Sequence, residues 1–305
     1  MLNRKNAVLT KEHSVRETEL RHLVDTRTHR PQAIAEAAAR RLPARSLLGG
    51  HGRLMVIAAD HPARGAIRAG DRPLAMAHRA DLLDRLCLAL SRPGVNGVLG
   101  TPDILEDLLL LGALDDKVVI GSMNRGGLAG TAFEIDDRFT AYDAASIAAA
   151  GFDGGKMLIR IDPEDRSTAA TLQACATAVN ELAAQRLVAM IEPFISRRVD
   201  GKVRNDLTPE AMIRAITVAS GLGNTSAYTW LKVPYVDDME RVMAASTLPA
   251  LILGGEVAPD QSAVMAAWRK TLQLPTVRGF VIGRSLLFPP DDNVAAAVDA
   301  VVEML

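Results

Sequence analysis

Short apolar runs alternate with longer amphipathic stretches along most of this chain. The apolar runs cover residues 53–60, 95–100, 117–122, 154–162, 187–194, 227–235, 249–256 and 279–284. Most of the stretches between them place apolar residues at helical spacing, as residues 76–91 and 208–220 do. Buried strands that alternate with helices predict a parallel sheet, because each helix returns the chain to the same end of the sheet. Eight such strands in about 250 residues favour a closed (β/α)8 barrel over an open, doubly wound sheet.

The connections carry local signals of their own. Thr208-Pro209 opens one helical stretch as an N-cap followed by proline at the first helical position. The connection over residues 123–153 is irregular at first and helical around residues 143–151. The first apolar run is not followed by Gly-x-Gly-x-x-Gly, which argues against a dinucleotide-binding fold.

Residues 1–50 are rich in Arg, Glu and Ala and contain no strand signal. The segment PQAIAEAAARR has a strongly helical composition. We therefore expect an N-terminal helical extension over residues 1–50 that covers the barrel or a neighbouring subunit. The barrel domain is expected at residues 51–305.

The net charge of −1 arises from 35 basic and 36 acidic residues, so no global field favours nucleic acid or an anionic membrane. Any anion must be bound by a local group of side chains. No signal-peptide pattern and no run of about 18 apolar residues is present, and we expect a cytoplasmic homo-oligomer that acts on small molecules. Cys87 and Cys175 both lie in apolar helical patterns and are expected to be packed thiols.

The active site of a (β/α)8 barrel lies at the C-terminal ends of its strands. Polar residues and glycines that interrupt or follow the apolar runs are therefore the candidates for the site. They are Asp60, His61, Asn124, Arg125, Lys156, Arg160, Glu192, Lys232, Gly254, Gly255, Gly283 and Arg284. His61 is the only one of the six histidines at a predicted strand end, so we predict no metal site.

Lysine is scarce in this chain, with seven lysines against 28 arginines. Two of the seven, Lys156 and Lys232, fall inside apolar runs. Burial lowers the pKa of a lysine by disfavouring the charged form, and the neutral amine is the form that attacks a ketone. A guanidinium group cannot perform this chemistry, which gives a chain that otherwise prefers arginine a reason to keep lysine there.

Strand alternation groups the candidate residues by face. The side chains that share a face are Tyr228, Trp230 and Lys232 on one run, Lys156, Leu158 and Arg160 on another, and Met190 and Glu192 on a third. If these faces point into the barrel, one site contains two lysines and a carboxylate. A second cation would depress the pKa of Lys232 further, and Glu192 could pair with whichever lysine is charged. The ordinary alternative is that each lysine is solvated or salt-bridged, and that Asp60-His61 only begins a loop.

Two groups of residues are candidates for anion binding. Gly254, Gly255 and Gly283 allow close approach of the backbone to a phosphate, and Arg284 adds a charged donor. The alternative for these glycines is an ordinary tight turn. The loop after residue 194 carries four cations, Arg197, Arg198, Lys202 and Arg204. Arg197 and Arg198 are predicted to bind a second anionic group of the substrate, although an ordinary solvated loop remains open.

These motifs resemble those of the class I barrel aldolases related to tagatose-bisphosphate aldolase, sulfofructose-phosphate aldolase and the archaeal-type fructose-bisphosphate aldolases. The resemblance covers about residues 53–290 and rests on AADHP at 58–62, GGKMLIRID at 154–162, MIEP at 190–193, WLKVPY at 230–235, LGGE at 253–256 and VIGRSLLF at 281–288. As a whole, the chain resembles a barrel family encoded beside actinobacterial inositol-catabolism genes. The long N-terminal extension and the sequence SRRVDGKVRND after Glu192 depart from the aldolase pattern.

The resemblance implies a (β/α)8 aldolase in which Lys232 forms a Schiff base with a phosphorylated keto-sugar. It implies that Glu192 transfers protons, that Lys156 positions oxygens and tunes Lys232, and that Asp60 holds hydroxyls or shares proton transfer. The implied substrate is 2-deoxy-5-keto-gluconate 6-phosphate, cleaved to dihydroxyacetone phosphate and malonate semialdehyde without a cofactor. Two other classes stay open: a phosphosugar lyase or isomerase without a covalent intermediate, and a non-catalytic sugar-phosphate sensor.

Overall fold

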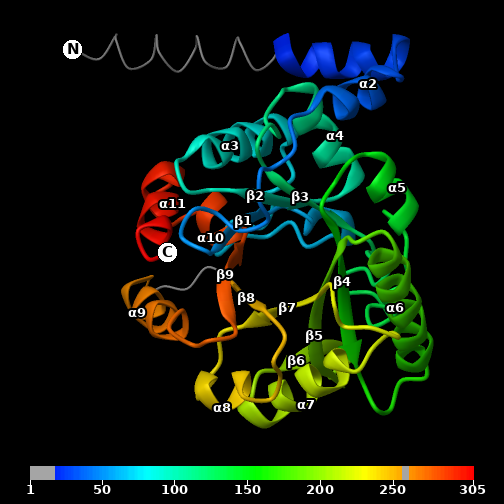
Figure 1. Cartoon of the computed structure of the whole chain (residues 1–305), viewed down its shortest axis with the longest axis vertical. Helices are drawn as coiled ribbons and strands as arrows, with labels where there is room; N and C mark the ends of the chain where they lie inside the picture. The colour runs from blue at the N-terminus through cyan, green and yellow to red at the C-terminus, as the bar shows by residue number, and fades with distance from the viewer. Residues whose placement is uncertain (1–17, 256–260) are drawn as a thin grey trace.

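The computed structural model describes residues 18–255 and 261–305, and the barrel in it is formed by eight parallel strands (Figure 1). These strands are β1 (Leu54–Ala58), β2 (Gly97–Gly100), β3 (Val118–Ser122), β4 (Gly154–Ile161), β5 (Val188–Val199), β7 (Thr229–Pro234), β8 (Ala250–Leu253) and β9 (Val277–Ile282). Pairing of β1 with β9 and of β4 with β5 closes the sheet. The predicted (β/α)8 barrel is confirmed, and each apolar run supplies one barrel strand.

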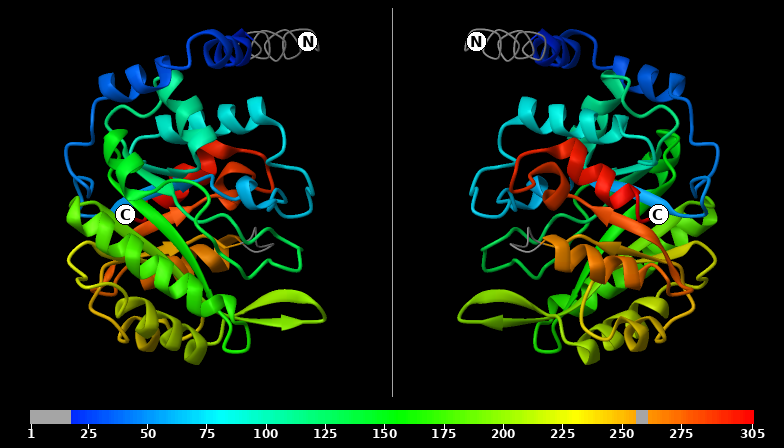
Figure 2. Two further views of the ribbon diagram at one scale, coloured as in Figure 1. Left: turned by 90° about the vertical axis from the view of Figure 1, so that its right-hand side faces the viewer. Right: turned by 90° about the vertical axis from the view of Figure 1, so that its left-hand side faces the viewer.

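Helices follow most of the barrel strands and surround the sheet in both views of Figure 2. They are α3 (Arg79–Ser91), α4 (Pro102–Leu110), α5 (Ala144–Ala149), α6 (Ser167–Ala184), α7 (Pro209–Ser220), α8 (Met239–Met243), α9 (Gln261–Thr271), α10 (Arg284–Leu287) and α11 (Val294–Val302), with a 3-10 turn η1 at Pro62–Arg64. Thr208 caps α7 by accepting a hydrogen bond from Ala211 N, and Asp143 with Ser146 forms a capping box on α5. The predicted N-cap at Thr208 is confirmed, and α5 lies in the stretch that was predicted to be helical around residues 143–151.

The segment after Glu192 is a β-hairpin, whereas the sequence analysis treated it as a loop. Strand β5 continues to Val199 and pairs antiparallel with β6 (Lys202–Asp206). Asp200 and Gly201 at the turn have φ values of 50° and 74°, which matches a turn that needs two residues with positive φ. The Asp-Gly pair was the signal for this hairpin, and Figure 2 shows the hairpin projecting from the body of the barrel.

The barrel interior is filled by side chains at alternate positions of the strands. Leu54, Val56, Leu99, Val118, Ile120, Val188, Met190, Leu251 and Val281 form this inner cluster, with Trp230 packed against it. Met190 and Trp230 therefore share the interior with Glu192 and Lys232, as the alternation predicts. The outward side chains pack against the helices in a second, larger cluster, which contains Cys175. Cys175 is buried and Cys87 is half-buried, so both are packed thiols.

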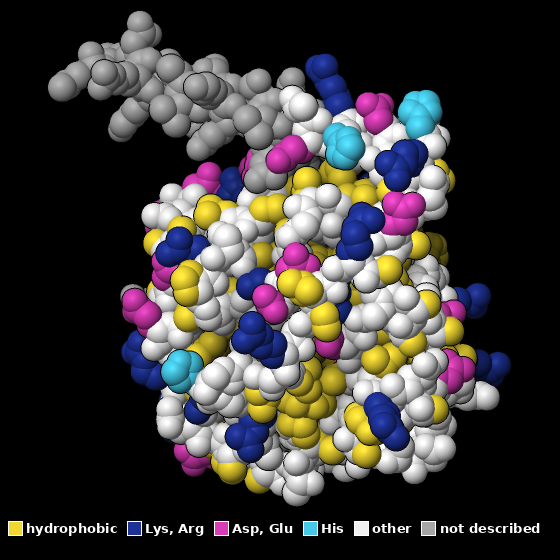
Figure 3. Space-filling view, turned by 45° about the horizontal axis from the view of Figure 1, so that its top comes forward, with side chains coloured by type: hydrophobic (Ala, Val, Ile, Leu, Met, Phe, Trp, Pro, Cys, Tyr) yellow, Lys and Arg dark blue, Asp and Glu magenta, His cyan; other side chains and the backbone are white. Residues whose placement is uncertain are grey.

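The N-terminal segment covers one side of the barrel and also closes its base. Residues 18–29 are helical, and α2 (Ala33–Arg40) packs against α4. Residues 41–50 are not helical, and Ala44, Leu47 and Leu48 pack against the inner cluster at the N-terminal end of the strands. Residues 1–17 of the predicted extension lie outside the described residues. Figure 3 shows the side of the molecule that carries the N-terminal helices, where basic, acidic and apolar side chains are interspersed.

Candidate active site

Most of the candidate residues meet in one cavity of about 430 Å³ at the C-terminal end of the barrel. Asp60 follows β1, Lys156 lies on β4, Glu192 on β5 and Lys232 on β7. The cavity is lined further by His61, Arg64, Arg125, Glu134, Leu158, Arg160, Phe194, Val203, Arg204, Asn205, Leu207, Pro234, Leu253, Gly254, Gly255, Gly283 and Arg284. The alternation of the strands explains why residues so distant in the sequence converge there.

Glu192 lies between the two lysines at the floor of this cavity. Its Oε1 is 2.9 Å from Nζ of Lys232, and its Oε2 is hydrogen-bonded to Nζ of Lys156. All three side chains are buried, with Lys156 only 1% exposed. A lysine that is solvated, or that only forms a stabilising salt bridge, does not need a second buried amine on the same carboxylate. The shared carboxylate therefore favours a functional role for these two lysines.

Asp60 provides the second carboxylate of the site. Its Oδ2 is 3.1 Å from Nζ of Lys156 and 3.2 Å from Nη1 of Arg125, and it also accepts a hydrogen bond of 3.1 Å from Oγ of Ser122. Asp60 and Glu192 therefore hold Lys156 from two sides. Ser122, at the end of β3, is a site residue that the sequence analysis did not identify.

Burial and mutual charge shift the pKa values of these groups in different directions. Burial lowers the pKa of Lys156 to about 8, and the charge of Arg125 contributes to this shift. Burial alone would raise the pKa of Glu192, but the charges of Lys156 and Lys232 outweigh it and hold that pKa well below its usual range. At neutral pH the site therefore contains an ionised Glu192 and a lysine, Lys156, that gains or loses a proton near physiological pH.

Burial and neighbouring charges also compete in setting the pKa values of Asp60 and His61, and they leave Asp60 charged and His61 uncharged. Burial would raise the pKa of Asp60, but the charges of Arg125, Lys156 and Lys232 hold it well below its usual value. Burial lowers the pKa of His61 well below its ordinary value. At neutral pH Asp60 is therefore a carboxylate and His61 an uncharged imidazole.

Arg160 lies in the cavity wall, but other protein groups occupy most of its donors. Its Nε is 3.0 Å from Oδ2 of Asp137, and its Nη2 contacts Oδ1 of Asp137 and the carbonyl of Glu134. Asn124 does not enter the cavity and instead pairs with both backbone groups of Leu158. Both residues therefore fix the loop after β3 against β4.

Two of the three glycines after β8 and β9, Gly254 and Gly283, lie where a side chain would not fit. A Cβ on Gly283 would stand 2.4 Å from the carbonyl oxygen of Ala58, and one on Gly254 would stand 2.5 Å from Cγ2 of Ile282. Gly255 has φ +66°, which favours glycine. Arg284 begins the short helix α10 and donates to the carbonyl of Arg68 at 3.2 Å. Glu256 of the LGGE motif lies outside the described residues.

The hairpin brings a different cation to the cavity from the two that were predicted. Arg197 and Arg198 lie on β5 outside the cavity lining, and Arg198 donates to the carbonyl of Ala132 at 2.8 Å. Arg204 on β6 lines the cavity instead. Arg64 also lines the cavity, although it was not among the predicted site residues; it lies in the 3-10 turn after β1, beyond the strand end.

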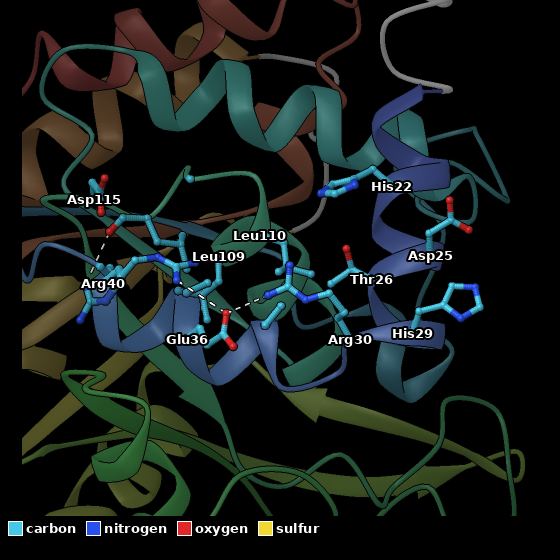
Figure 4. A pocket seen from close by; sticks show the side chains of 15 residues that line it. His22, Asp25, Thr26, His29, Arg30, Glu36, Arg40, Leu109, Leu110 and Asp115 are labelled. Atoms are coloured by element: carbon cyan, nitrogen blue, oxygen red, sulfur yellow. Dashed lines mark hydrogen bonds and ion pairs between the residues drawn. The ribbon is translucent and has the colours of Figure 1, made fainter.

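A larger hollow of about 690 Å³ lies between the N-terminal helices and α4, away from the strand ends (Figure 4). Its walls carry His22, Asp25, His29, Arg30, Glu36, Arg40 and Asp115, among others. Glu36 pairs with Arg30 at 3.2 Å and with Arg40 at 3.8 Å, so its carboxylate partly offsets the charges of the two arginines. The hollow contains none of the candidate residues of the barrel.

Within residues 18–255 and 261–305, no three His, Cys, Asp or Glu side chains gather as metal ligands would. The helices in the same part of the chain are all too short or too polar to cross a membrane.

Solved structures share this fold. An archaeal fructose 1,6-bisphosphate aldolase matches with a TM-score of 0.65 at 18% identity, over 89% of this chain and 98% of that chain. A Schiff base-forming fructose-1,6-bisphosphate aldolase matches with a TM-score of 0.64 at 18% identity, over 89% and 99% of the two chains. The protein is thus a (β/α)8 barrel with the fold of these aldolases.

Residues 52–302 match the family described as Cgl0159-like, and the chain belongs to this family. The crystal structure of Cgl0159 from Corynebacterium glutamicum is similar along almost its whole length. The two chains are 53% identical with a TM-score of 0.91, over 94% of this chain and 96% of that one. No curated protein matches the chain.

Proposed function

We propose that this protein is a class I aldolase that cleaves a phosphorylated keto-sugar through a Schiff base on Lys232. The observation that carries the proposal is the contact of Lys232 with Glu192, which Lys156 shares from its other side. A buried amine on an inner strand face, with a carboxylate at hydrogen-bond distance, has both the position and the partner that imine formation needs. The fold shared with a Schiff base-forming aldolase supports the same reaction class.

The proposed reaction uses these side chains in turn. Glu192 accepts a proton from the Lys232 ammonium, and the neutral amine attacks the substrate ketone. One proton moves from the nitrogen to the carbinolamine oxygen, and Glu192 returns its own proton to that oxygen as water leaves. The resulting iminium withdraws electrons from the adjacent carbon. A base takes the proton of the hydroxyl on the next carbon, the bond between these two carbons breaks, and an aldehyde departs. The enamine then takes up a proton at carbon, and hydrolysis of the iminium releases the second product and restores Lys232.

Asp60 and Lys156 have supporting roles in this proposal. The Asp60 carboxylate is fixed by Ser122 and Arg125 and is the second candidate for the base. Lys156 in its charged form donates to substrate oxygens and keeps Glu192 ionised, which leaves Lys232 as the amine that must act as nucleophile.

The charge of the cavity supports an anionic substrate. Seven cationic side chains line it, namely Arg64, Arg125, Lys156, Arg160, Arg204, Lys232 and Arg284, against three carboxylates, Asp60, Glu134 and Glu192. The whole chain carries a net charge of −1, so this excess of cations is local. The backbone after β8 and β9, with Gly254, Gly255, Gly283 and Arg284, is the proposed phosphate site.

The finer proposal follows the resemblance to the barrels of inositol-catabolism clusters. The substrate is 2-deoxy-5-keto-gluconate 6-phosphate, and the products are dihydroxyacetone phosphate and malonate semialdehyde. This substrate carries a negative group at each end, which suits the cation-rich cavity. The proposed enzyme acts in the cytoplasm as a homo-oligomer.

The test is borohydride reduction of the full-length protein with dihydroxyacetone phosphate, followed by mass spectrometry of its peptides. The expected adduct lies on Lys232 and is absent from Lys232→Met, while Lys202→Met on the exposed hairpin still forms it. An adduct on Lys156 would overturn the assignment of the nucleophile. Turnover of ketose phosphates without any adduct would identify a lyase or isomerase that acts by acid–base chemistry. Binding without turnover would identify a sugar-phosphate sensor.

A further inference from the structure

Two groups of cations face each other across the mouth of the barrel. The strand order around the barrel is β1–β2–β3–β4–β5–β7–β8–β9, so β3 and β4 lie opposite β8 and β9. Arg125 follows β3, and Arg284 follows β9. Glu192 and Lys232 lie between these two sides on β5 and β7, and Lys156 lies on β4 on the same side as Arg125. A ligand that reaches Lys232 from the β8 and β9 loops therefore points its far end toward Arg125.

Arg125 lines the cavity and has a buried N–H group without a hydrogen-bond partner among the described residues. Its Nε donates to the carbonyl of Asn124 at 2.9 Å, and its Nη1 lies 3.2 Å from Oδ2 of Asp60. Its Nη2 is buried and has no hydrogen-bond partner among the described residues, although the side chain is only 4% exposed. Buried donors are rarely left unpaired, so this group is placed to meet a ligand.

Arg64 adds a second donor of the same kind. Its Nη1 is buried and has no hydrogen-bond partner among the described residues; the nearest carboxylate oxygen, on Glu134, is 3.7 Å away. Burial lowers the pKa of Arg64, and the nearby charges of Arg160 and Arg125 lower it further. Asp137 pairs with Arg160, Asp60 with Arg125 and, at 3.7 Å, Glu134 with Arg64. An anion bound between Arg64 and Arg125 would further offset the repulsion between these two cations.

We propose that Arg64 and Arg125 form a second anion subsite, which binds the end of the substrate that lies farthest from the β8 and β9 loops. The two guanidinium groups each offer one N–H, which suits two oxygens of a single carboxylate or phosphoryl group. The substrate class is then a keto-sugar with a negative group at both ends. This inference rests on the proposed function for the placement of the reacting carbons at Lys232, and it replaces Arg197 and Arg198 as the second anion site.

The test measures anion binding to the full-length, unmodified protein by isothermal titration calorimetry with inorganic phosphate and with malonate. Wild type is expected to bind phosphate at two sites, of which Arg64→Gln weakens one by about 10- to 100-fold, the effect of losing one charge-assisted contact. Arg284→Gln is expected to weaken the other. The matched control is Arg198→Gln, an arginine of the hairpin outside the cavity lining, which should leave both sites unchanged.

The two probes separate the two kinds of anion, and a second variant guards against misfolding. Malonate binding that depends on Arg64 identifies a carboxylate subsite, and phosphate binding alone identifies a phosphoryl subsite. Arg64→Lys keeps the charge but lacks the planar fork, so it should weaken the subsite less than Arg64→Gln. Anion binding that ignores both Arg64 variants, or that wild type lacks, would overturn the proposal. Because this measurement needs no turnover, its failure is distinct from the absence of a Schiff-base adduct on Lys232.

Discussion

Nζ of Lys232 lies 2.9 Å from Oε1 of Glu192, and the same carboxylate binds Lys156 through its other oxygen. Glu192→Gln keeps the shape of the side chain but removes its charge, which leaves two buried amines with less compensation. We expect kcat to fall by about 100- to 10,000-fold, the range for a lost proton-transfer group. Steady-state kinetics measure the effect. Glu181→Gln, at an exposed position of α6, is the control, and equal activity of the two variants would contradict the role of Glu192.

The pKa of Lys156, lowered to about 8, predicts the basic limb of the pH profile. Lys156 is charged below that pH and neutral above it, so activity that needs its charged form declines as pH rises past about 8. Arg125→Gln removes a charge that lowers this pKa, and the limb should move to higher pH. The profile of kcat/KM between about pH 6 and 10 measures the shift. A limb that stays in place or moves to lower pH would refute this coupling.

Gly283 is predicted to be irreplaceable in the phosphate site, because a Cβ there would stand 2.4 Å from the carbonyl oxygen of Ala58. Gly283→Ala must displace the backbone at the start of α10, so we expect KM for a phosphorylated substrate to rise by about 10-fold or more, roughly the effect of one lost charge-assisted contact. Gly221→Ala is the control, since its nearest neighbour would be 3.7 Å away. An unchanged KM in Gly283→Ala would place the phosphate elsewhere.

Asp137 is expected to contribute to stability by compensating the buried charge of Arg160. Asp137→Ala leaves that charge with weaker partners, and breaking such a pair typically costs about 3–5 kcal/mol of unfolding free energy. Asp136→Ala, which breaks the solvent-exposed pair with Arg138, should cost about 1 kcal/mol or less. Urea titrations of the two variants provide the comparison. Similar losses in both would show that Arg160 does not depend on Asp137.

Activity is expected to persist in excess EDTA, because the Lys232 iminium supplies the electron withdrawal that a divalent metal would otherwise provide. An assay of wild type with and without EDTA measures this directly. Loss of activity that Zn²⁺ restores would favour a metal-dependent aldolase.

The convergence of Lys156, Glu192 and Lys232 could be predicted from the sequence because it depends on two local rules. Side chains alternate along a strand, and the ends of parallel strands meet at one edge of a sheet. Each residue sits at an inward position of a long apolar run, so its direction follows from its neighbours. The barrel itself was predictable for the same reason.

The partners of the arginines could not be predicted, because they depend on how loops fold against one another. Arg160 is on a strand, but its carboxylate partner Asp137 comes from a loop 23 residues earlier. Arg64 is held by a backbone hydrogen bond from Ala129 N to its carbonyl oxygen, a contact between two irregular segments. The base of the barrel is similar, since Leu47 and Leu48 lack a periodic pattern that would reveal their place in the inner cluster.

Closure of the barrel pairs both sides of all eight barrel strands with barrel neighbours, and the hairpin extends the sheet outward from the C-terminal end of β5. Within the described residues, β6 therefore forms an edge of the sheet, with no sheet partner on its outer side. Such an edge can recruit a strand from another molecule. Lys202, Arg204 and Asp206 place three charged side chains among its five residues, and charge along an edge discourages that pairing. The hairpin that supplies Arg204 to the cavity thus also carries charges that disfavour the addition of strands at this edge.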